Sequence, residues 1–457
     1  MLNIKIRSKI LLTILVLSVT ACTAAAPTQS PESPAGATPI STQISQGNNT
    51  SPENEVLTSA LQRIETTAEP REQQLLAADL NAFGLDLYQL LAAEPEGNLF
   101  FSPYSISLAL AMTYAGANAE TKEQMAQTLH FTLPDDQIHS SLNNLDQSLY
   151  VVPEYIENGE GNFQLNIANA IWGQSGYPFR QEYLDLLAQS YGAGLRIMDF
   201  KTAAEPARLE INDWVAQQTE DKIKDLIPQG ALTSDTRLVL TNAIYFFGAW
   251  LHEFSEDATQ PADFYLNSGK TFQTDMMNME ERFSYVKNSD LQMVEIPYFN
   301  SRYSMVLLMP LETELDQLTN TLDAVGLQDL LDNLISGQAI LSMPKFKFES
   351  SFSVNQALKD LGMVNAFTPG AADFSGMYEP DGDPLYISDV IHKAFVAVDE
   401  EGTEAAAATA VIMGIESAMP EEVEPVSLVF DHPFLFLIRD RESGLILFLG
   451  RVTEPLQ

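Results

Sequence analysis

The chain has 457 residues, and its charge balance and single cysteine already exclude several classes of protein. It carries 24 lysines and arginines against 62 aspartates and glutamates, which gives a formal net charge of −38. Nucleic acids and anionic membranes are bound through clustered basic side chains, so neither is expected as a direct partner. One cysteine excludes a disulfide framework and a cysteine-rich zinc site, and with only five histidines we expect no metal and no cofactor.

The first 21 residues have the pattern of an export signal. Three basic residues precede an apolar run at 10–19 that is too short to span a bilayer. The next residues, Val19-Thr20-Ala21-Cys22, resemble the lipobox of bacterial lipoproteins, in which the cysteine is lipidated and becomes the first residue of the mature chain. We therefore predict a lipid anchor at Cys22; the alternative is an ordinary secretory signal and a secreted protein.

The segment from residue 22 to residue 72 is expected to be a disordered tether. It is rich in Ala, Pro, Ser, Thr, Gln and Asn, and it lacks the apolar periodicity of a folded segment. About 50 residues of flexible chain have a root-mean-square reach of roughly 40 Å. Such a tether would hold a folded domain away from its lipid anchor.

From residue 73 to residue 457 the pattern is that of one α+β domain. Apolar residues recur at helical spacing after Gln73, and Ser102-Pro103 opens a second helix that continues to Tyr114. Residues 237–247 and 303–309 are nearly continuously apolar, as expected of buried strands. Further helical segments are predicted at 206–218, 315–334 and 354–361, and a C-terminal hairpin at 434–451.

A search for catalytic motifs gives little support to an enzyme. Gly173-Gln174-Ser175-Gly176 lacks the spacing of a nucleophile elbow, and His252-Glu253 lacks the second histidine of a zinc-peptidase motif. Gly269-Lys270-Thr271 resembles the end of a phosphate-binding loop, but Phe264 stands where that loop requires a glycine. Carboxylate pairs are expected by chance in so acidic a chain, and we interpret them as a solvated surface.

The most unusual segment runs from Asp399 to Ser417. It follows an alternating strand at 394–398 and contains four consecutive alanines at 405–408. An alanine-rich surface helix is the simplest interpretation, because Ala has the highest helix propensity. Read with a period of two, one face carries only small or apolar uncharged residues, so the same segment could be exposed first and later fit as a central strand. The residues alone leave both interpretations open and favour the helix.

Several blocks, in chain order, resemble the serpins, the serine protease inhibitor family. Residues 400–409 have the family's hinge pattern, Glu-x-Gly-Thr-x-Ala-Ala-Ala-Ala-Thr. Similar blocks occur at residues 98–106, 116–125, 211–223, 241–250, 343–347, 391–394 and 431–436. The resemblance covers residues 73–457. It implies a single serpin domain with a large central mixed β-sheet, further sheets, surrounding helices and an exposed reactive loop at about 400–424.

The resemblance also implies a mechanism that uses a metastable fold. A protease cleaves the loop and forms an acyl-enzyme; the hinge then inserts into the central sheet as an extra strand and drags the attached protease with it. Alternate hinge side chains must enter a packed interior, which requires small residues. The hinge residues in this sequence are Glu400, Gly402, Thr403, Ala405, Ala407 and Thr409.

The reactive bond is predicted by counting from the hinge. In the family the hinge glycine is usually the fifteenth residue before the cut, which puts the reactive bond at Glu416–Ser417. No Lys or Arg occurs between Lys393 and Arg439, so a trypsin-like enzyme has no target in this loop. Proteases that prefer Glu, and subtilisin- or elastase-like enzymes that accept Ile or Met, remain candidates. The alternative cleavage positions are Met413, Ile415 and Met419.

Other functional positions of the family are matched by motif. Trp250 and Glu400 match positions near the point where the loop joins the sheet. Four residues match the polar cluster beneath the centre of the main sheet, where strands part for insertion, and we expect a structural rather than a catalytic role for its histidine. These residues are Ser102, Ser105, Asn242 and His392.

The predicted protein is therefore a protease inhibitor and not an enzyme. We expect an extracytoplasmic, lipid-anchored monomer that inhibits serine or cysteine endopeptidases as a suicide substrate, through a covalent acyl complex. No Lys or Arg occurs between Lys122 and Arg180, where the family's heparin-binding helix lies, so no heparin activation is expected. The alternative is a non-inhibitory serpin-fold binding or carrier protein, and the small hinge residues favour inhibition.

Overall fold

The computed structural model describes residues 55–65, 69–93, 97–150, 163–299, 301–379, 383–403 and 424–455. All of them lie in one compact unit that extends from Pro52 to Gln457. No helix within these ranges is long and apolar enough to cross a membrane. The helices are α1 (Pro70–Ala92), α2 (Pro103–Tyr114), α3 (Ala119–Thr128), α4 (Asp135–Leu149), α5 (Gln181–Tyr191), α6 (Phe200–Gln218), α7 (Leu315–Thr319), α8 (Ala324–Asp332) and α9 (Asn355–Asp360), with short 3-10 turns η2 (Glu256–Ala258) and η3 (Asn365–Phe367).

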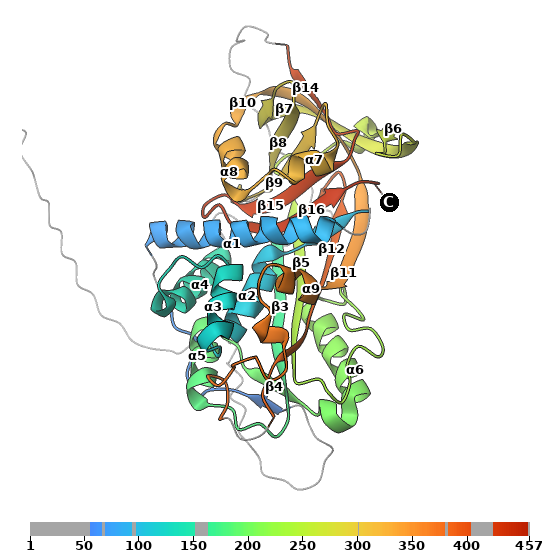
Figure 1. The fold of residues 1–457 in the computed structure, drawn as a ribbon. Coiled ribbons are helices and arrows are strands. Elements are labelled where there is room, and N and C mark those ends of the chain that lie inside the picture. The colour runs from blue at the N-terminus through green and yellow to red at the C-terminus, as the bar shows by residue number, and fades with distance from the viewer. Residues whose placement is uncertain are drawn as a thin grey trace, which may run out of the picture. The chain divides into compact units, whose positions relative to one another are not determined.

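Within the described ranges, seven strands form a mixed central sheet in the order β1-β4-β3-β5-β13-β12-β11. The pairs β3–β4 and β5–β12 are parallel, and the other neighbours are antiparallel. Figure 1 shows α2, α3 and α4 together on one side of β3 and β5, with α6 on the other. The strands are β1 (Glu55–Leu57), β3 (Phe163–Gln174), β4 (Leu195–Met198), β5 (Leu238–Ala249), β11 (Phe346–Ser353), β12 (Ile387–Val398) and β13 (Gly402–Thr403).

The other described strands form a second sheet in the order β14-β10-β7-β8-β9-β15-β16-β2, with β6 paired to β7. Its C-terminal strands β15 and β16 are the predicted hairpin, and β2 joins it from the early part of the chain. The strands are β2 (Leu99–Phe101), β6 (Gln260–Tyr265), β7 (Thr271–Lys287), β8 (Leu291–Pro297), β9 (Tyr303–Pro310), β10 (Ile335–Pro344), β14 (Val426–Val429), β15 (Phe434–Asp440) and β16 (Ile446–Val452).

Strand β5 is buried on both of its faces, which explains its continuously apolar sequence. Leu240 and Ile244 point into the main core, and their alternate neighbours Val239 and Ala243 pack in the smaller core beneath α6. A strand of this kind pairs on both edges, here with β3 on one side and with β12 and β13 on the other.

Aromatic side chains join the two sheets. Phe100 of β2 stacks on Phe436 of β15 at 5.5 Å and on Phe448 of β16 at 5.0 Å, and it meets Phe348 of β11 edge-on at 6.5 Å. Offset and edge-on ring pairs of this type add about 0.5–1.5 kcal/mol each beyond the burial of their surface. The second sheet therefore packs against β11 of the central sheet through these rings.

The predicted elements of the body are confirmed except in the segment 315–334. That segment is two helices, α7 and α8, and not one helical piece. The break follows from a local capping signal, because the Asp323 side chain accepts a hydrogen bond from the Gly326 N–H at 2.8 Å and starts α8 anew.

The structure also differs from the predicted tether. Residues 55–57 form β1, which pairs with β4, and the Ile64 N–H donates to the Gln189 carbonyl at 3.0 Å. Arg63 donates to Asn143 at 2.7 Å and pairs with Asp146 at 2.6 Å, both on α4. The prediction of a disordered segment is therefore wrong for residues 55–65. The segment shows no apolar periodicity because backbone pairing with β4 and the polar contacts of Arg63 hold it, with Leu57 packed against the core.

Candidate functional site

The predicted hinge begins in a tight turn, which we call the hinge junction (residues 399–403). The chain leaves β12 at Val398 and reverses into β13, and the Asp399 N–H donates to the Gly402 carbonyl at 3.0 Å. The Asp399 side chain in turn accepts from the backbone N–H groups of Glu401 and Gly402, at 3.1 and 3.3 Å. An aspartate that binds the backbone two or three residues ahead is a common device for fixing such a reversal.

The two residues of β13 lie inside the central sheet. Gly402 pairs with Ala249 and Thr403 pairs with Gly248, both of β5, while Thr403 also pairs with Val398 of β12. Thr403 is only 2% exposed. The prediction that the reactive loop is exposed from about residue 400 is therefore wrong for Gly402 and Thr403. The turn at the hinge junction directs these two residues back between β5 and β12.

Glycine is required where this segment passes β5. A Cβ atom added at Gly402 would lie 2.2 Å from the Gly248 carbonyl oxygen and 2.8 Å from the Ala249 Cα, which are distances that backbone atoms cannot accept. Gly248 is equally constrained, since a Cβ there would lie 2.9 Å from the Tyr298 ring. The two glycines allow a backbone and an aromatic ring to approach the same point of β5.

The Thr403 hydroxyl has a specific partner. It shares a hydrogen bond of 2.7 Å with the hydroxyl of Tyr298, which follows β8. The Tyr298 ring stacks on Trp250 at 4.8 Å and meets Phe246 edge-on at 5.1 Å. Burial raises the pKa of Tyr298 far above its usual range, so the hydroxyl stays protonated and able to donate.

Trp250 lies at the hinge junction, where the family motif puts it. Its indole N–H donates to the Asp399 carbonyl at 3.0 Å, and its backbone N–H donates to the Glu401 carbonyl at 2.9 Å. Trp250 thus binds the turn at two points, one through its side chain and one through its backbone.

Glu400 is held by a basic and a polar partner. Its carboxylate pairs with Lys345 at 2.6 Å and accepts from the Thr259 hydroxyl at 2.7 Å, and the side chain is 9% exposed. Burial acts to raise the pKa of Glu400, but the hydrogen bonds from Lys345 and Thr259 outweigh it, and the pKa lies below its usual value. The ion pair therefore ties the hinge junction to the start of β11.

The four predicted residues of the polar cluster are brought together beneath the middle of the central sheet. The His392 Nε2 accepts from the Ser102 N–H at 3.2 Å, so its proton lies on Nδ1, which donates to the Asn242 side-chain oxygen. The Asn242 amide donates to the Ser105 hydroxyl at 2.7 Å and to Asn169 at 2.8 Å. All but Asn169 are fully buried, and Asn169 of β3 is a member that the sequence did not reveal.

This cluster joins β5 and β12, the two strands that the predicted insertion would have to separate. His392 and Asn242 are register partners on β12 and β5, and Asn169 is the partner of Asn242 on β3. Burial lowers the pKa of His392 to about 3, so the imidazole is neutral in the folded protein. The histidine is therefore a neutral hydrogen-bonding bridge between Ser102 and Asn242.

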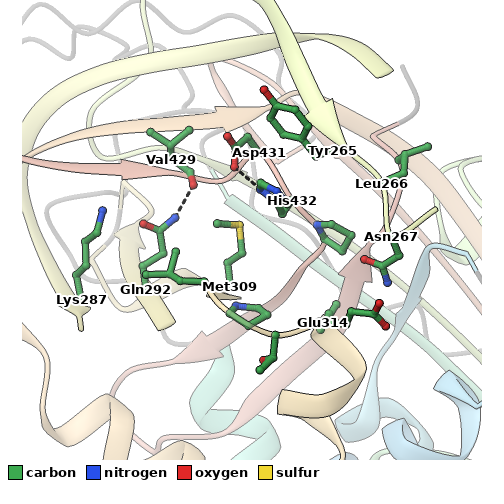
Figure 2. Close-up of a pocket in the computed structure, with 15 residues that line it drawn as sticks. Tyr265, Leu266, Asn267, Lys287, Gln292, Met309, Glu314, Val429, Asp431 and His432 are labelled. Atoms are coloured by element: carbon green, nitrogen blue, oxygen red, sulfur yellow. Dashed lines mark hydrogen bonds and ion pairs between the residues drawn. The ribbon is translucent and has the colours of Figure 1, made fainter. Parts of the chain in front are cut away.

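The C-terminal end of the predicted loop is held at β14, the edge strand of the second sheet. β14 pairs in parallel with β10, and the carbonyls of Ser427 and Val429 accept from the side chains of Lys287 and Gln292, at 2.6 and 2.5 Å. Figure 2 shows the Gln292–Val429 and Asp431–His432 hydrogen bonds among the residues that line a hollow of about 400 Å³. The side chains of Lys287 and Gln292 thus give hydrogen-bond partners to two carbonyls on the edge of β14 that does not pair with β10.

The remaining predicted site residues fall outside the described ranges. Of the residues that sequence reasoning missed, Lys345 stood within a recognised block and Asp399 begins the unusual segment 399–417, while the others lie on distant parts of the chain. The predicted residues that lie outside are Cys22, Ala405, Ala407, Thr409, Met413, Ile415, Glu416, Ser417 and Met419. The missed residues are Asn169, Thr259, Tyr298, Lys345 and Asp399.

Comparison with known proteins gives the same family from sequence and from fold. The family model for Serpin (serine protease inhibitor) matches residues 78–455. The chain is 40% identical over 377 residues to an uncharacterized serpin-like protein of Thermococcus kodakarensis, which covers 82% of this chain and 85% of that protein. It is 39% identical over 393 residues to the leukocyte elastase inhibitor of Homo sapiens, covering 84% of this chain and all of the relative.

Solved structures extend the agreement to the fold. The thermophilic serpin tengpin in its native state superposes with a TM-score of 0.76 at 28% identity, over 88% of this chain and 99% of tengpin. Serpin48 of the insect Tenebrio molitor gives a TM-score of 0.72 at 30% identity, over 85% of this chain and all of that one. The chain belongs to the serpin family, whose members include inhibitors of proteases, and it has the serpin fold.

Proposed function

We propose that this serpin inhibits extracytoplasmic serine endopeptidases, and cysteine endopeptidases of similar specificity, as a suicide substrate. A target protease cleaves the reactive loop at Glu416–Ser417 and remains bound to it as an acyl-enzyme, while the hinge enters the central sheet. The observation that carries the proposal is the position of Gly402 and Thr403, which already pair with β5 and β12 in the alignment of an inserted strand.

The existing register predicts where the rest of the hinge would lie after cleavage. If β13 continued antiparallel to both neighbours, Ala405 would come between Phe246 and Val396, and Ala407 would come between Ile244 and Ala394. Alternate residues point to the same face of a sheet, so these alanines would follow Thr403 toward the main core. Small side chains there meet a face that is already filled by large ones.

The same register predicts a role for Thr409. It would arrive in the row of Asn242 and His392, whose mutual hydrogen bond has to break when β5 and β12 separate. A buried donor or acceptor left without a partner costs about 1–3 kcal/mol. A threonine hydroxyl between the two side chains can both donate and accept, so it would replace the lost bond and remove that cost.

The composition of the loop indicates the class of target. Several relatives carry the name leukocyte elastase inhibitor, and the loop of this chain offers Met413, Ile415 and Glu416 but no Lys or Arg. We therefore propose elastase-like, subtilisin-like or Glu-preferring proteases as targets, and exclude trypsin-like ones.

The test is incubation with elastase, subtilisin, a Glu-specific protease and trypsin, followed by a denaturing gel and mass spectrometry of the released C-terminal fragment. We expect a covalent complex with at least one of the first three, no complex with trypsin, and a fragment that begins at Ser417. The Thr403→Arg variant should still be cleaved but should form no complex. Cleavage by all three proteases without any complex would support the non-inhibitory alternative.

We also propose that Cys22 carries a lipid that anchors the protein to the cell envelope. The support is the export-signal pattern and the occurrence of the one cysteine of the chain at the position a lipobox requires. In a bacterial host the wild type should partition with membranes and incorporate labelled fatty acid. The Cys22→Ser variant should lose both, and retention of the label would contradict the proposal.

A further inference from the structure

Strands β5 and β12 are already parted at one end. They pair directly with each other only as far as Ile244 and Ala394. Beyond that row, β13 stands between them and pairs with Gly248 on one side and Val398 on the other. The position of Thr403 therefore corresponds to the first step of strand insertion, taken before any cleavage.

We propose that the hydrogen bond between Tyr298 and Thr403 is a latch that holds the hinge in this partly inserted position, which makes Tyr298 a positioning residue for the insertion reaction. The proposal rests on the inhibitory function proposed above and adds the residue that sets its starting point.

The Tyr298 hydroxyl is fixed independently of the hinge. Its ring is 1% exposed and is clamped by the stack on Trp250 and the edge-on contact with Phe246. Within the described residues, its hydrogen-bond partner is the Thr403 hydroxyl, at 2.7 Å. If the hinge withdrew, a buried hydroxyl would lose its partner, so the aromatic cluster favours the inserted position.

The latch also preserves the register needed later. A slip of one residue would turn every hinge side chain to the opposite face of the sheet, and the small residues would no longer meet the core. Because Thr403 keeps the same partner at rest and after insertion, the strand can grow from an existing row. Growth from a formed row avoids the cost of starting a new one while the acyl-enzyme is at risk of hydrolysis.

The latch predicts non-additive effects of removing its two hydroxyls. Tyr298→Phe leaves the Thr403 hydroxyl buried without a partner, and Thr403→Val leaves the Tyr298 hydroxyl in the same state. The double variant has two apolar groups of matching shape, which can be nearly as stable as the original pair. Each single variant should release the hinge, and the double variant should restore it.

The test is hydrogen–deuterium exchange of a peptide that contains residues 399–403, measured on the full chain without protease. Exchange should accelerate about tenfold in each single variant, which corresponds to about 1.4 kcal/mol, and should return toward wild type in the double variant. Tyr183→Phe is the matched control, because Tyr183 is a buried tyrosine that donates to the Met112 carbonyl far along the chain from the hinge. It should leave the hinge peptide unchanged.

A second measurement connects the latch to inhibition. With a protease that forms complexes, the trapped fraction should fall in the single variants and recover in the double variant, while the rate of loop cleavage stays constant. Equal exchange in wild type and Tyr298→Phe, or additive effects in the double variant, would overturn the latch. Since exchange needs no protease, a protected hinge in a protein that traps nothing would refute the inhibitory function and leave the latch standing.

Discussion

Acid should weaken this fold through His392. The imidazole is completely buried and neutral, and burial lowers its pKa to about 3 from an ordinary value of 6.5. The unfolded chain binds a proton at His392 as the pH falls below 6.5, while the folded chain does not bind one until about pH 3. The contribution of His392 to stability is therefore complete above pH 6.5 and is lost progressively between pH 6.5 and pH 3.

The size of the effect follows from these two values. At pH 5 the preference of the unfolded state for the proton amounts to about 2 kcal/mol, and at pH 3 it approaches about 4–5 kcal/mol. Other groups contribute to the total pH dependence, above all His139, whose pKa is lowered by burial to about 4. The contribution of His392 must therefore be measured as a difference from a variant that lacks the imidazole.

The variant is His392→Gln, compared with wild type by urea unfolding at pH 8 and pH 5. At pH 8 the variant should be less stable by about 1–3 kcal/mol, because glutamine cannot reproduce both hydrogen bonds of the imidazole. At pH 5 the gap between the two should be smaller by about 2 kcal/mol. His432→Gln, at a histidine whose side chain is 54% exposed, controls for removal of an imidazole as such. Parallel stability profiles for wild type and His392→Gln would refute the reasoning.

Three further predictions concern single contacts. Lys345→Met removes the ion-pair partner of the Glu400 carboxylate, which is 9% exposed, and should lower the free energy of unfolding by about 1–3 kcal/mol at pH 7. Lys345 helps to hold the pKa of Glu400 below its usual 4.5. The difference in urea midpoint between variant and wild type should therefore close as the pH falls below about 4.5. Arg63→Ala removes two contacts to α4 and should increase deuterium exchange in residues 55–65 while exchange in β5 stays constant. Thr409→Val should reduce the stabilisation that follows loop cleavage by about 1–3 kcal/mol, measured as a smaller rise in melting temperature, and should leave the uncleaved protein unchanged.

Much of the fold could be predicted from the sequence, because its signals are local. The continuous apolar run of β5, the Ser102-Pro103 start of α2 and the C-terminal hairpin all follow from patterns within one or two neighbouring elements. Residues 55–65 could not be predicted in this way. A strand of three residues has no periodicity to detect, and it forms because β4 offers a free edge and α4 offers Asn143 and Asp146 to Arg63.

The candidate site also has a part that the sequence predicts and a part that it does not. Gly402, Thr403 and the polar cluster could be proposed because family motifs mark them, but the motifs do not tell which partners they meet. Tyr298 lies 105 positions from Thr403, and nothing around it in the sequence distinguishes it from other buried tyrosines. Its role becomes visible only when β8, β5 and the hinge junction are brought to one point by the fold.

Two sets of hydrogen bonds then oppose each other along the same pair of strands. The Tyr298–Thr403 bond favours separation of β5 and β12 at one end, while the His392–Asn242 bond holds them together six residues along β5. A typical hydrogen bond contributes only about 0.5–1.5 kcal/mol net, so neither set alone gives a large barrier. In the proposed mechanism the fold waits for cleavage and then inserts a strand quickly. That mechanism needs such a balance, because a stronger polar cluster would delay insertion and a weaker one would let the sheet open without a protease. The resting position of Thr403 is thus where the two sets balance, and a change at either of them should shift it.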